Sequence, residues 1–341
     1  MGITMRHVSF KISMLLLVCL CLNLNAYGQI NQKPPAAPAQ WTGLLGEYIL
    51  NGQIILLSEI DGKLHALSDN DLNLSLRETA ANQFITDNNI SLSFKRDNEA
   101  EAISLLYNDK IYQRNHIEPR DGNTFKVSLD KSIEDYTRAA LNQKPPIEEG
   151  EFRPSDLVDV TNYINNVKLD VRYATSNNFL GVATYSQAKT FLQRPAATAI
   201  AKANQKLNAM GYGLLMHDGY RPWYVTKIFW DATEGPERDF VADPSKGSKH
   251  NRGCAIDLTL YDLKTGQTVK MVGTYDEMSA RSYPDYKGGT SLERWHRDLL
   301  RSAMEEVGFS VNSLEWWHFD YKDWQKYPIL NEKFENISPT K

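Results

Sequence analysis

The segment SKHNRGCAIDLTLYD, residues 248–262, contains side chains that can bind a metal ion. His250 and Asp257 lie seven residues apart with Gly253 between them, and the segment then alternates like a strand. Imidazole nitrogens and carboxylate oxygens are zinc donors, and a catalytic zinc site takes three protein ligands and leaves one position for water. His318 in EWWHF is the natural third ligand. Taken alone, Asp257 is equally consistent with a buried, hydrogen-bonded carboxylate.

Hydrolysis at such a metal would need two more groups. A base must take the proton of the water and hand it to the leaving amine, and Glu315 is the candidate. Since Glu315 lies three residues before His318, the two would face opposite sides of an ideal strand. The assignment therefore requires a bend at Trp316–Trp317 or a Glu315 placed just before the strand. A cation must meet the charge that develops on the carbonyl oxygen, and Arg221 in DGYRP is the best candidate.

Alternation predicts the strands that carry these residues. In CAIDLTLY, residues 254–261, Ile256 and Leu258 share one strand face, and Asp257 lies on the other, away from the aliphatic side. YGLLMHDGYRP, residues 212–222, predicts a buried strand that ends in a turn. The two segments therefore predict neighbouring core strands with polar groups at their ends.

Two helices are predicted around these strands. RPAATAIAKANQKLNAMG, residues 194–211, has proline in its first turn and glycine just past its end. TSLERWHRDLLRSAMEEVG, residues 290–308, begins with a capping box of Thr290 and Glu293 and has an apolar stripe at helical spacing. His296, which lies among charged residues, is expected on the surface of this helix.

Two copies of the pentapeptide NQKPP punctuate the first half of the chain. Both lie in proline-rich, polar segments without hydrophobic period, which predicts linkers at 29–42 and 136–154. Between them, residues 43–135 contain short apolar runs and two hairpin signals, Asn51-Gly52 and Asp61-Gly62. This pattern predicts a small β-rich accessory domain, an antiparallel sheet or barrel, without catalytic residues.

The first 28 residues have the features of a signal peptide. A positively charged start precedes a short apolar run and a small-residue site at Ala26–Gly28. We therefore expect a periplasmic or secreted protein without a stable membrane span after cleavage, although retention as an anchor stays open. Cleavage would leave Cys254 as the sole cysteine, so no internal disulfide can form.

Composition excludes one class of partner. The 341 residues carry a formal net charge of -4 and no basic block, so the chain lacks the electrostatic footprint of a nucleic-acid-binding protein. The 42% hydrophobic and 23% charged content is ordinary for a globular protein of two domains.

From about residue 155 to 330 the chain resembles the zinc-dependent D-alanyl-D-alanine dipeptidases, the VanX type found in vancomycin-resistance clusters and in cell-wall turnover, which implies a dipeptidase domain at 155–335. The matching pieces are LDVRYATSNNFLG, GYGLLMHDGYRP, SKHNRGCAIDLTLYDLKTG, YDEM and LRSAMEEVGFSVNSLEWWHF, in family order. The resemblance implies an α+β fold, with a central antiparallel sheet flanked by helices behind the β-rich domain. It also implies hydrolysis of the D-Ala-D-Ala dipeptide or a related peptidoglycan peptide, in wall turnover or glycopeptide resistance.

The resemblance implies roles for seven residues and one zinc ion per chain. The zinc ligands fall on His250, Asp257 and His318, and the base on Glu315. The arginine that steadies the transition state falls on Arg221. Ser248 and Asp276 fall among the substrate contacts, with Asp276 suited to pairing the free ammonium group of a dipeptide.

Two departures from the family pattern leave alternatives open. Only 28 residues separate Arg221 from His250, so the loop over the site is expected to be short and open to longer peptides. His217 stands where the family tends to carry tryptophan. A D,D-carboxypeptidase acting on longer peptidoglycan stems is therefore one alternative. A zinc-containing wall-binding module without enzymatic activity is another, although Glu315 disfavours it.

Overall fold

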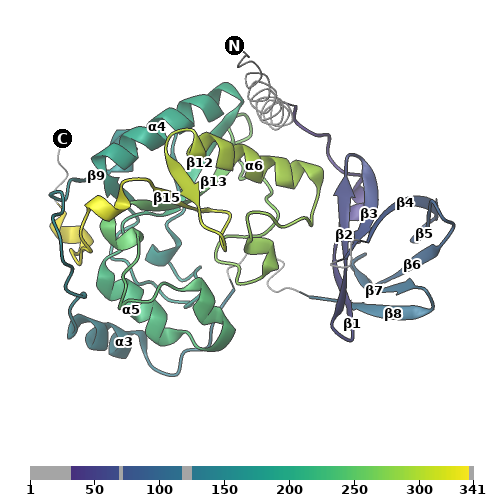
Figure 1. Ribbon diagram of the computed structural model, residues 1–341, viewed down its shortest axis with the longest axis horizontal. Coiled ribbons are helices and arrows are strands. Elements are labelled where there is room, and N and C mark those ends of the chain that lie inside the picture. Colours follow the sequence, from purple (N-terminus) through teal and green to yellow (C-terminus); the bar gives the residue numbers. More distant parts are fainter. Residues whose placement is uncertain (1–31, 69–71, 117–124, 338–341) are drawn as a thin grey trace, which may run out of the picture.

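The computed structural model describes residues 32–68, 72–116 and 125–337. The predicted signal peptide lies outside the described residues. Two hydrophobic cores are present, one inside an N-terminal barrel and one in a larger C-terminal domain (Figure 1). Among the described residues, no helix combines the length and apolarity needed to cross a membrane.

The predicted β-rich segment is a closed barrel of eight antiparallel strands. Asn51-Gly52 and Asp61-Gly62 form the first two turns with positive φ at every position, as predicted from the sequence. Pairing of the first strand with the last closes the barrel. The strands are β1 (Gly46–Leu50), β2 (Gln53–Ile60), β3 (Lys63–Leu67), β4 (Asn73–Ala80), β5 (Gln83–Thr86), β6 (Ser91–Arg96), β7 (Ala102–Tyr107) and β8 (Lys110–Arg114).

The segment predicted as a linker, 136–154, packs on the C-terminal domain. Helix α3 (Ile133–Leu141) begins inside the predicted β-rich domain, and its Tyr136 and Ala140 belong to the core of the C-terminal domain. Beyond it, Glu148 accepts from Arg252 at 2.5 Å. This stretch is therefore bound to the C-terminal domain by packing and by a partly buried ion pair, which its polar, proline-rich composition does not reveal. Before the barrel, the predicted linker 29–42 ends in the short helix α2 (Ala39–Thr42).

A five-stranded sheet forms the centre of the C-terminal domain. Its order is β10-β12-β13-β15-β14, and a separate pair is made by β9 and β11. The predicted antiparallel sheet is correct for four of these strands, but β10 pairs in parallel with β12. The strands are β9 (Leu157–Asp159), β10 (Lys168–Leu169), β11 (Phe191–Gln193), β12 (Tyr212–Asp218), β13 (Ala255–Asp262), β14 (Phe309–Val311) and β15 (His318–Tyr321).

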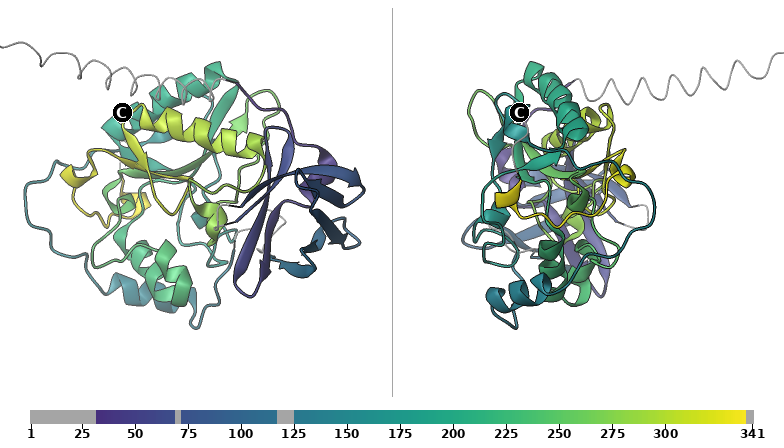
Figure 2. Two further views of the ribbon diagram at one scale, coloured as in Figure 1. Left: turned by 45° about the vertical axis from the view of Figure 1, so that its right-hand side comes forward. Right: turned by 90° about the vertical axis from the view of Figure 1, so that its left-hand side faces the viewer.

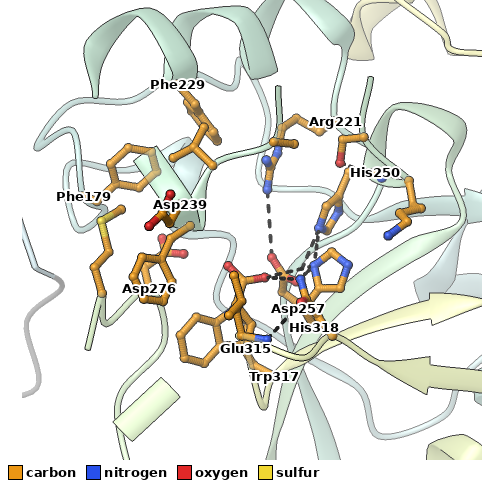
Figure 3. A pocket seen from close by; sticks show the side chains of 18 of the residues that line it. Phe179, Arg221, Phe229, Asp239, His250, Asp257, Asp276, Glu315, Trp317 and His318 are labelled. Atoms are coloured by element: carbon orange, nitrogen blue, oxygen red, sulfur yellow. Dashed lines mark hydrogen bonds and ion pairs between the residues drawn. The ribbon is translucent and has the colours of Figure 1, made fainter. Parts of the chain in front are cut away.

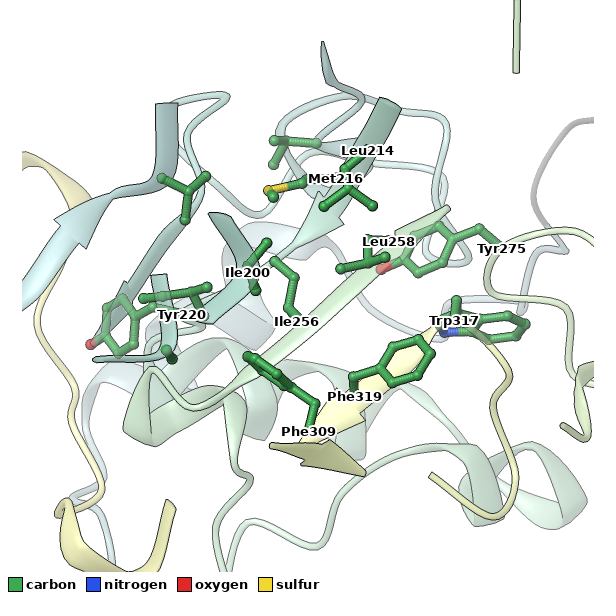
Figure 4. Close-up of a cluster of buried hydrophobic side chains, with 14 of the residues drawn as sticks. Ile200, Leu214, Met216, Tyr220, Ile256, Leu258, Tyr275, Phe309, Trp317 and Phe319 are labelled. Carbon is green, nitrogen blue, oxygen red and sulfur yellow. The ribbon is translucent and has the colours of Figure 1, made fainter. Parts of the chain in front are cut away.

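Helices α4 (Arg194–Ala209) and α6 (Ser291–Glu305) pack together against this sheet. Their apolar stripes meet the aliphatic strand face that contains Ile256 and Leu258 (Figure 4). The predicted capping box at the start of α6 is present. His296 is buried rather than on the surface, because α6 turns it toward Tyr212, whose hydroxyl lies 3.2 Å from Nε2.

Helix α5 (Trp223–Ala232) packs against α3 in a second lobe. The barrel lies at the end of the molecule where α6 begins (Figure 2). Helices α4 and α6 cover the opposite face of the sheet from Asp257. The predicted site residues gather on the face that carries Asp257.

Candidate active site and metal centre

Register between β13 and β15 sets the first two candidate ligands side by side. Asp257 pairs directly with His318 across the antiparallel ladder. Directly opposed residues project from the same face of a sheet with their Cβ atoms about 4.5–5.5 Å apart. Asp257 and His318, which are 61 positions apart in the sequence, are therefore neighbours in the structure.

His250 comes from the single-turn helix η4 (His250–Arg252), which precedes β13. The turn is ended by Gly253 at φ 65°, where a Cβ atom would lie 2.4 Å from Leu157 Cδ2. Glycine is therefore required here by both conformation and space. His250 Nδ1 donates to Gly219 O at 2.6 Å, which fixes the tautomer and directs the lone pair of Nε2 into the site.

His318 is oriented in the same manner from the other side. Its Nε2 lies 2.9 Å from Asp320 Oδ1, and Lys249 Nζ lies 3.0 Å from Asp320 Oδ2. Donation to this carboxylate leaves the lone pair of Nδ1 facing the centre. Burial alone would lower the pKa of His318, but Asp320 and Asp257 raise it well above its ordinary value, and the same two carboxylates would favour a metal cation at Nδ1 in place of a proton.

Three acceptor atoms thus converge in a buried space (Figure 3). Asp257 Oδ1 lies 3.4 Å from His250 Nε2 and 3.1 Å from His318 Nδ1, and the two ring nitrogens are 3.1 Å apart. Within the described chain, Asp257 Oδ1 is buried without a hydrogen bond. Burial alone would raise the pKa of Asp257, but the two imidazoles lower it, so the carboxylate is ionised. Two nitrogens and one oxygen in this arrangement fit a zinc ion.

Glu315 lies in a turn just before β15, one of the two arrangements that its spacing from His318 required. Its Oε2 is 3.4 Å from His318 Nδ1 and accepts from Asn312 Nδ2 at 3.1 Å. Burial raises the pKa of Glu315 to about 7, with Asp257 adding to the rise and His318 opposing it. A carboxylate with this pKa, adjacent to the candidate ligands, is suited to accept and return a proton near neutral pH.

A β-bulge brings Asp218 and Arg221 to the same centre. Between Met216 and Asp218 the register of β12 shifts, so that Asp218 pairs with Asp257. Asp218 Oδ2 accepts from Arg221 Nε at 3.0 Å and Nη2 at 2.8 Å, and Nη2 lies 4.0 Å from Asp257 Oδ2. Burial opposes the charge of Arg221, but Asp218 holds its pKa well above the ordinary value, so the guanidinium stays cationic.

Ser248 and Asp276 line the cavity beside this centre. Ser248 Oγ accepts from the backbone N–H of His250 at 3.2 Å. Asp276 is held at φ 58°, and its Oδ1 accepts from Tyr173 O–H at 3.1 Å. Its Oδ2 is buried without a hydrogen-bond partner in the described chain, and burial and the nearby Asp257 raise the pKa of Asp276 well above its ordinary value. A cationic group is the partner that would satisfy this oxygen.

The cavity has a volume of about 210 Å³. After α5, residues 239–242 of the short segment between Arg221 and His250 contribute to its wall. Whether longer peptides enter above this short segment stays a prediction. Apolar residues supply much of the remaining wall, namely Tyr173, Phe179, Phe229, Met278, Leu314 and Trp317.

Four further residues support the site and were not selected from the sequence. Asp218 hydrogen-bonds the Arg221 guanidinium, and Asn251 hydrogen-bonds the Arg221 carbonyl group. Tyr275 hydrogen-bonds Asp257, and Asp320 hydrogen-bonds His318. Asp320 could have been found, because residues two apart on a strand share a face. His217 lies outside the ligand set: its ring stacks on Tyr275 at 4.2 Å and its Nδ1 lies 3.2 Å from Asp170 O.

Comparison with known proteins gives one consistent result. The family model described as D-ala-D-ala dipeptidase matches residues 153–338. The D-alanyl-D-alanine dipeptidase of Escherichia coli K12 is 36% identical over 186 residues, 54% of this chain and 95% of that protein. The protein of the same name from Enterococcus faecium is 37% identical over 183 residues, 48% of this chain and 90% of that protein. That from Enterococcus faecalis is 36% identical, with the same coverage. The barrel lies outside the family match.

Proposed function

Since the chain belongs to the D-Ala-D-Ala dipeptidase family, we propose that it hydrolyses the D-alanyl-D-alanine dipeptide with one zinc ion held by His250, Asp257 and His318. The observation that carries the assignment is the convergence of these three buried acceptor atoms beside Glu315 and Arg221. When bound, zinc supplies a water of lowered pKa and polarises the peptide carbonyl.

The surrounding side chains supply the proton and charge chemistry. Glu315 accepts a proton from the attacking water and returns it to the leaving amine. Its pKa, raised to about 7, suits both transfers near neutral pH. The Arg221 guanidinium, held by Asp218, stabilises negative charge that develops on the carbonyl oxygen. Being charged and fixed beforehand, it needs no reorganisation during the reaction.

The far end of the cavity selects for a free amino terminus. Asp276 Oδ2 is buried and has no hydrogen-bond partner within the described residues. An ammonium group placed there would form an ion pair with it and offset the energetic cost of burying the carboxylate. Ser248 adds a hydroxyl on the wall near His250. The cavity of about 210 Å³, to whose wall residues 239–242 contribute, favours a dipeptide over a longer peptidoglycan stem.

The central test separates an enzyme from a wall-binding module. Glu315→Gln keeps the shape of the side chain but removes the base, so zinc content should be unchanged while turnover of D-Ala-D-Ala falls by about two to four orders of magnitude. Dipeptide binding should be retained, because Asp276 is untouched. If the fully zinc-loaded, unmutated protein cleaves neither the dipeptide nor a pentapeptide stem, the binding-module alternative is correct.

The ligand assignment has its own test. His318→Ala removes one of three donors, and the variant should lose its zinc on dialysis, as measured by metal analysis. Glu315→Gln, treated identically, is the matched control because Glu315 is not a ligand in this scheme. Full zinc retention in His318→Ala would contradict the assignment.

We also propose that the enzyme acts in the periplasm or outside the cell, on cell-wall peptides. Support comes from the signal-like sequence at residues 1–28. Cell fractionation and N-terminal sequencing of the purified protein would test this: a mature chain that begins near Gln29 is expected, whereas an intact cytoplasmic chain would contradict it.

A further inference from the structure

The barrel docks on the segment that leads into α6. The Glu59 N–H, near the end of β2, donates to Gly289 O at 3.1 Å, and a short parallel bridge joins Ser58 to Gly289. Ser58 Oγ also donates to Lys287 O at 2.7 Å. Ser58 is 0% exposed and Glu59 is 2% exposed, so the junction is both polar and buried. Buried polar groups that lack hydrogen-bond partners cost free energy, so the arrangement in which all of these bonds form is favoured over other placements of the barrel.

The first turn of α6 completes the junction. The Arg294 guanidinium donates to Ser58 Oγ at 2.9 Å and to Glu59 O at 2.6 Å. Glu59 Oε2 accepts from the backbone N–H of Ser291, the first residue of the helix, at 2.7 Å. A carboxylate there satisfies a free N–H and interacts favourably with the helix dipole. The barrel therefore supplies a capping group to a helix of the other domain.

The residues that precede the docked segment in the sequence line the cavity at the proposed ammonium site. The turn at 274–282 is closed by the buried Glu277 and holds Asp276 at φ 58°. At the end of this turn, Ser282 O accepts from the backbone N–H of Trp316 at 2.7 Å. Trp316 directly follows the proposed base. One continuous segment thus links the barrel to the proposed ammonium site and to the turn that carries the base.

We infer that the barrel is a positioning element of the dipeptide site: by holding residues 287–291 through Ser58 and Glu59, it fixes the segment that presents Asp276. This inference rests on the proposed function, in which Asp276 binds the substrate's ammonium group. It gives the barrel, which lies outside the family match, a role in substrate affinity. Arg294 acts through the same segment and is a positioning residue.

The test uses the full-length, zinc-loaded protein. Arg294→Met keeps a long side chain on α6 but removes its hydrogen bonds to Ser58 and Glu59 of the barrel, together with those to the carbonyl groups of residues 287–289. Hydrogen exchange should become faster in residues 274–291, and KM for D-Ala-D-Ala should rise by about three- to tenfold, a typical size for such coupling. The change in kcat should be smaller, and zinc content should stay the same. Ser58→Ala removes a group of the barrel alone, so it should act in the same direction and separates the contribution of the barrel from the direct contacts of Arg294 with residues 287–289.

A matched control lies on the same helix. Arg301→Met removes an arginine that bonds Glu305 at 2.7 Å and, within the described chain, makes no hydrogen bond to the barrel, so it should alter neither exchange in 274–291 nor KM. In an Asp276→Asn background, Arg294→Met should raise KM little further, since both changes affect one interaction.

The outcomes are separable. If Ser58→Ala and Arg294→Met loosen residues 287–291 but leave exchange in 274–282 and KM unchanged, the barrel is not a positioning element. If Asp276→Asn fails to raise KM, the proposed ammonium site is wrong. In that case exchange in 274–282 still decides whether the barrel holds the segment.

Discussion

At the scale of single residues, the charge of Arg221 is fixed before substrate arrives. Both of its contacts to Asp218 use one carboxylate oxygen, and the guanidinium lies 4.7 Å from the Phe229 ring centre. A buried, oriented cation of this kind stabilises a transition state at little reorganisation cost. The residue's own contacts thus support a role in chemistry rather than in folding alone.

Arg221→Ala should therefore lower kcat by roughly two to three orders of magnitude, with a much smaller effect on KM. Steady-state kinetics on D-Ala-D-Ala would measure both, and zinc content should be unchanged because Arg221 is not a proposed ligand. A loss confined to KM would instead identify Arg221 as a group that binds the ground state.

Asp218→Asn tests whether Asp218 acts through Arg221. Removing its charge weakens the hold on the guanidinium, so kcat should fall on the order of tenfold. In the double variant with Arg221→Ala, the second change should add little, because the group that it positions is gone. Full additivity of the two losses would show that Asp218 has a separate role.

At the scale of elements, the edge strand β10 is joined to the sheet by a parallel pair and by charged groups at its end. Asp170, the next residue, has its pKa lowered to about 2, first by a hydrogen bond from His217 and then by the charges of His217 and Arg172, against the effect of burial. The unfolded chain protonates an aspartate near pH 4. This group therefore stabilises the fold above pH 4, and the contribution is lost as the pH falls from 4 to 2.

Asp170→Asn should lower the free energy of unfolding at pH 7 by at most about 1 kcal/mol, because the side chain is 39% exposed and its charge is screened. Urea unfolding at pH 7 and at pH 2.5 would show the deficit at pH 7 and little of it at acid pH. An equal deficit at both values would mean that packing, and not the charge, is responsible.

At the scale of the whole molecule, the described residues form two separate hydrophobic cores, and a bound metal would affect the stability of only one of them. Zinc binding would stabilise the C-terminal core alone, because the proposed ligands all lie there. Six of the chain's seven tryptophans lie between residues 223 and 324, and Trp41 alone lies beside the barrel. Tryptophan fluorescence therefore reports on the domain that would carry the metal.

A chelator should shift the tryptophan melting transition to lower temperature. Zinc at 100 times its Kd contributes about 2.7 kcal/mol of stability, which corresponds to a shift of several degrees. His318→Ala should melt at the same temperature with and without chelator. A wild-type transition that the chelator leaves unmoved would argue against a metal bound by the folded state.

Local sequence determined much of this protein. The hairpins at Asn51 and Asp61, the capped helix at Thr290 and the strand face of Asp257 follow from turn chemistry, capping and alternation, which act over a few residues. Residue types and spacing singled out five candidate site residues, the family resemblance added Ser248 and Asp276, and the structure brings all seven to one cavity.

Only the tertiary structure decided how these pieces meet. The pairing of Asp257 with His318, the bulge that turns Asp218 toward Arg221, and the burial of His296 all depend on which distant element lies alongside. The same holds for the parallel β10, the packing of α3 on the C-terminal core, and the closure of the barrel. Periodicity fixes which face of an element is apolar, but it carries no information about the neighbour that covers that face.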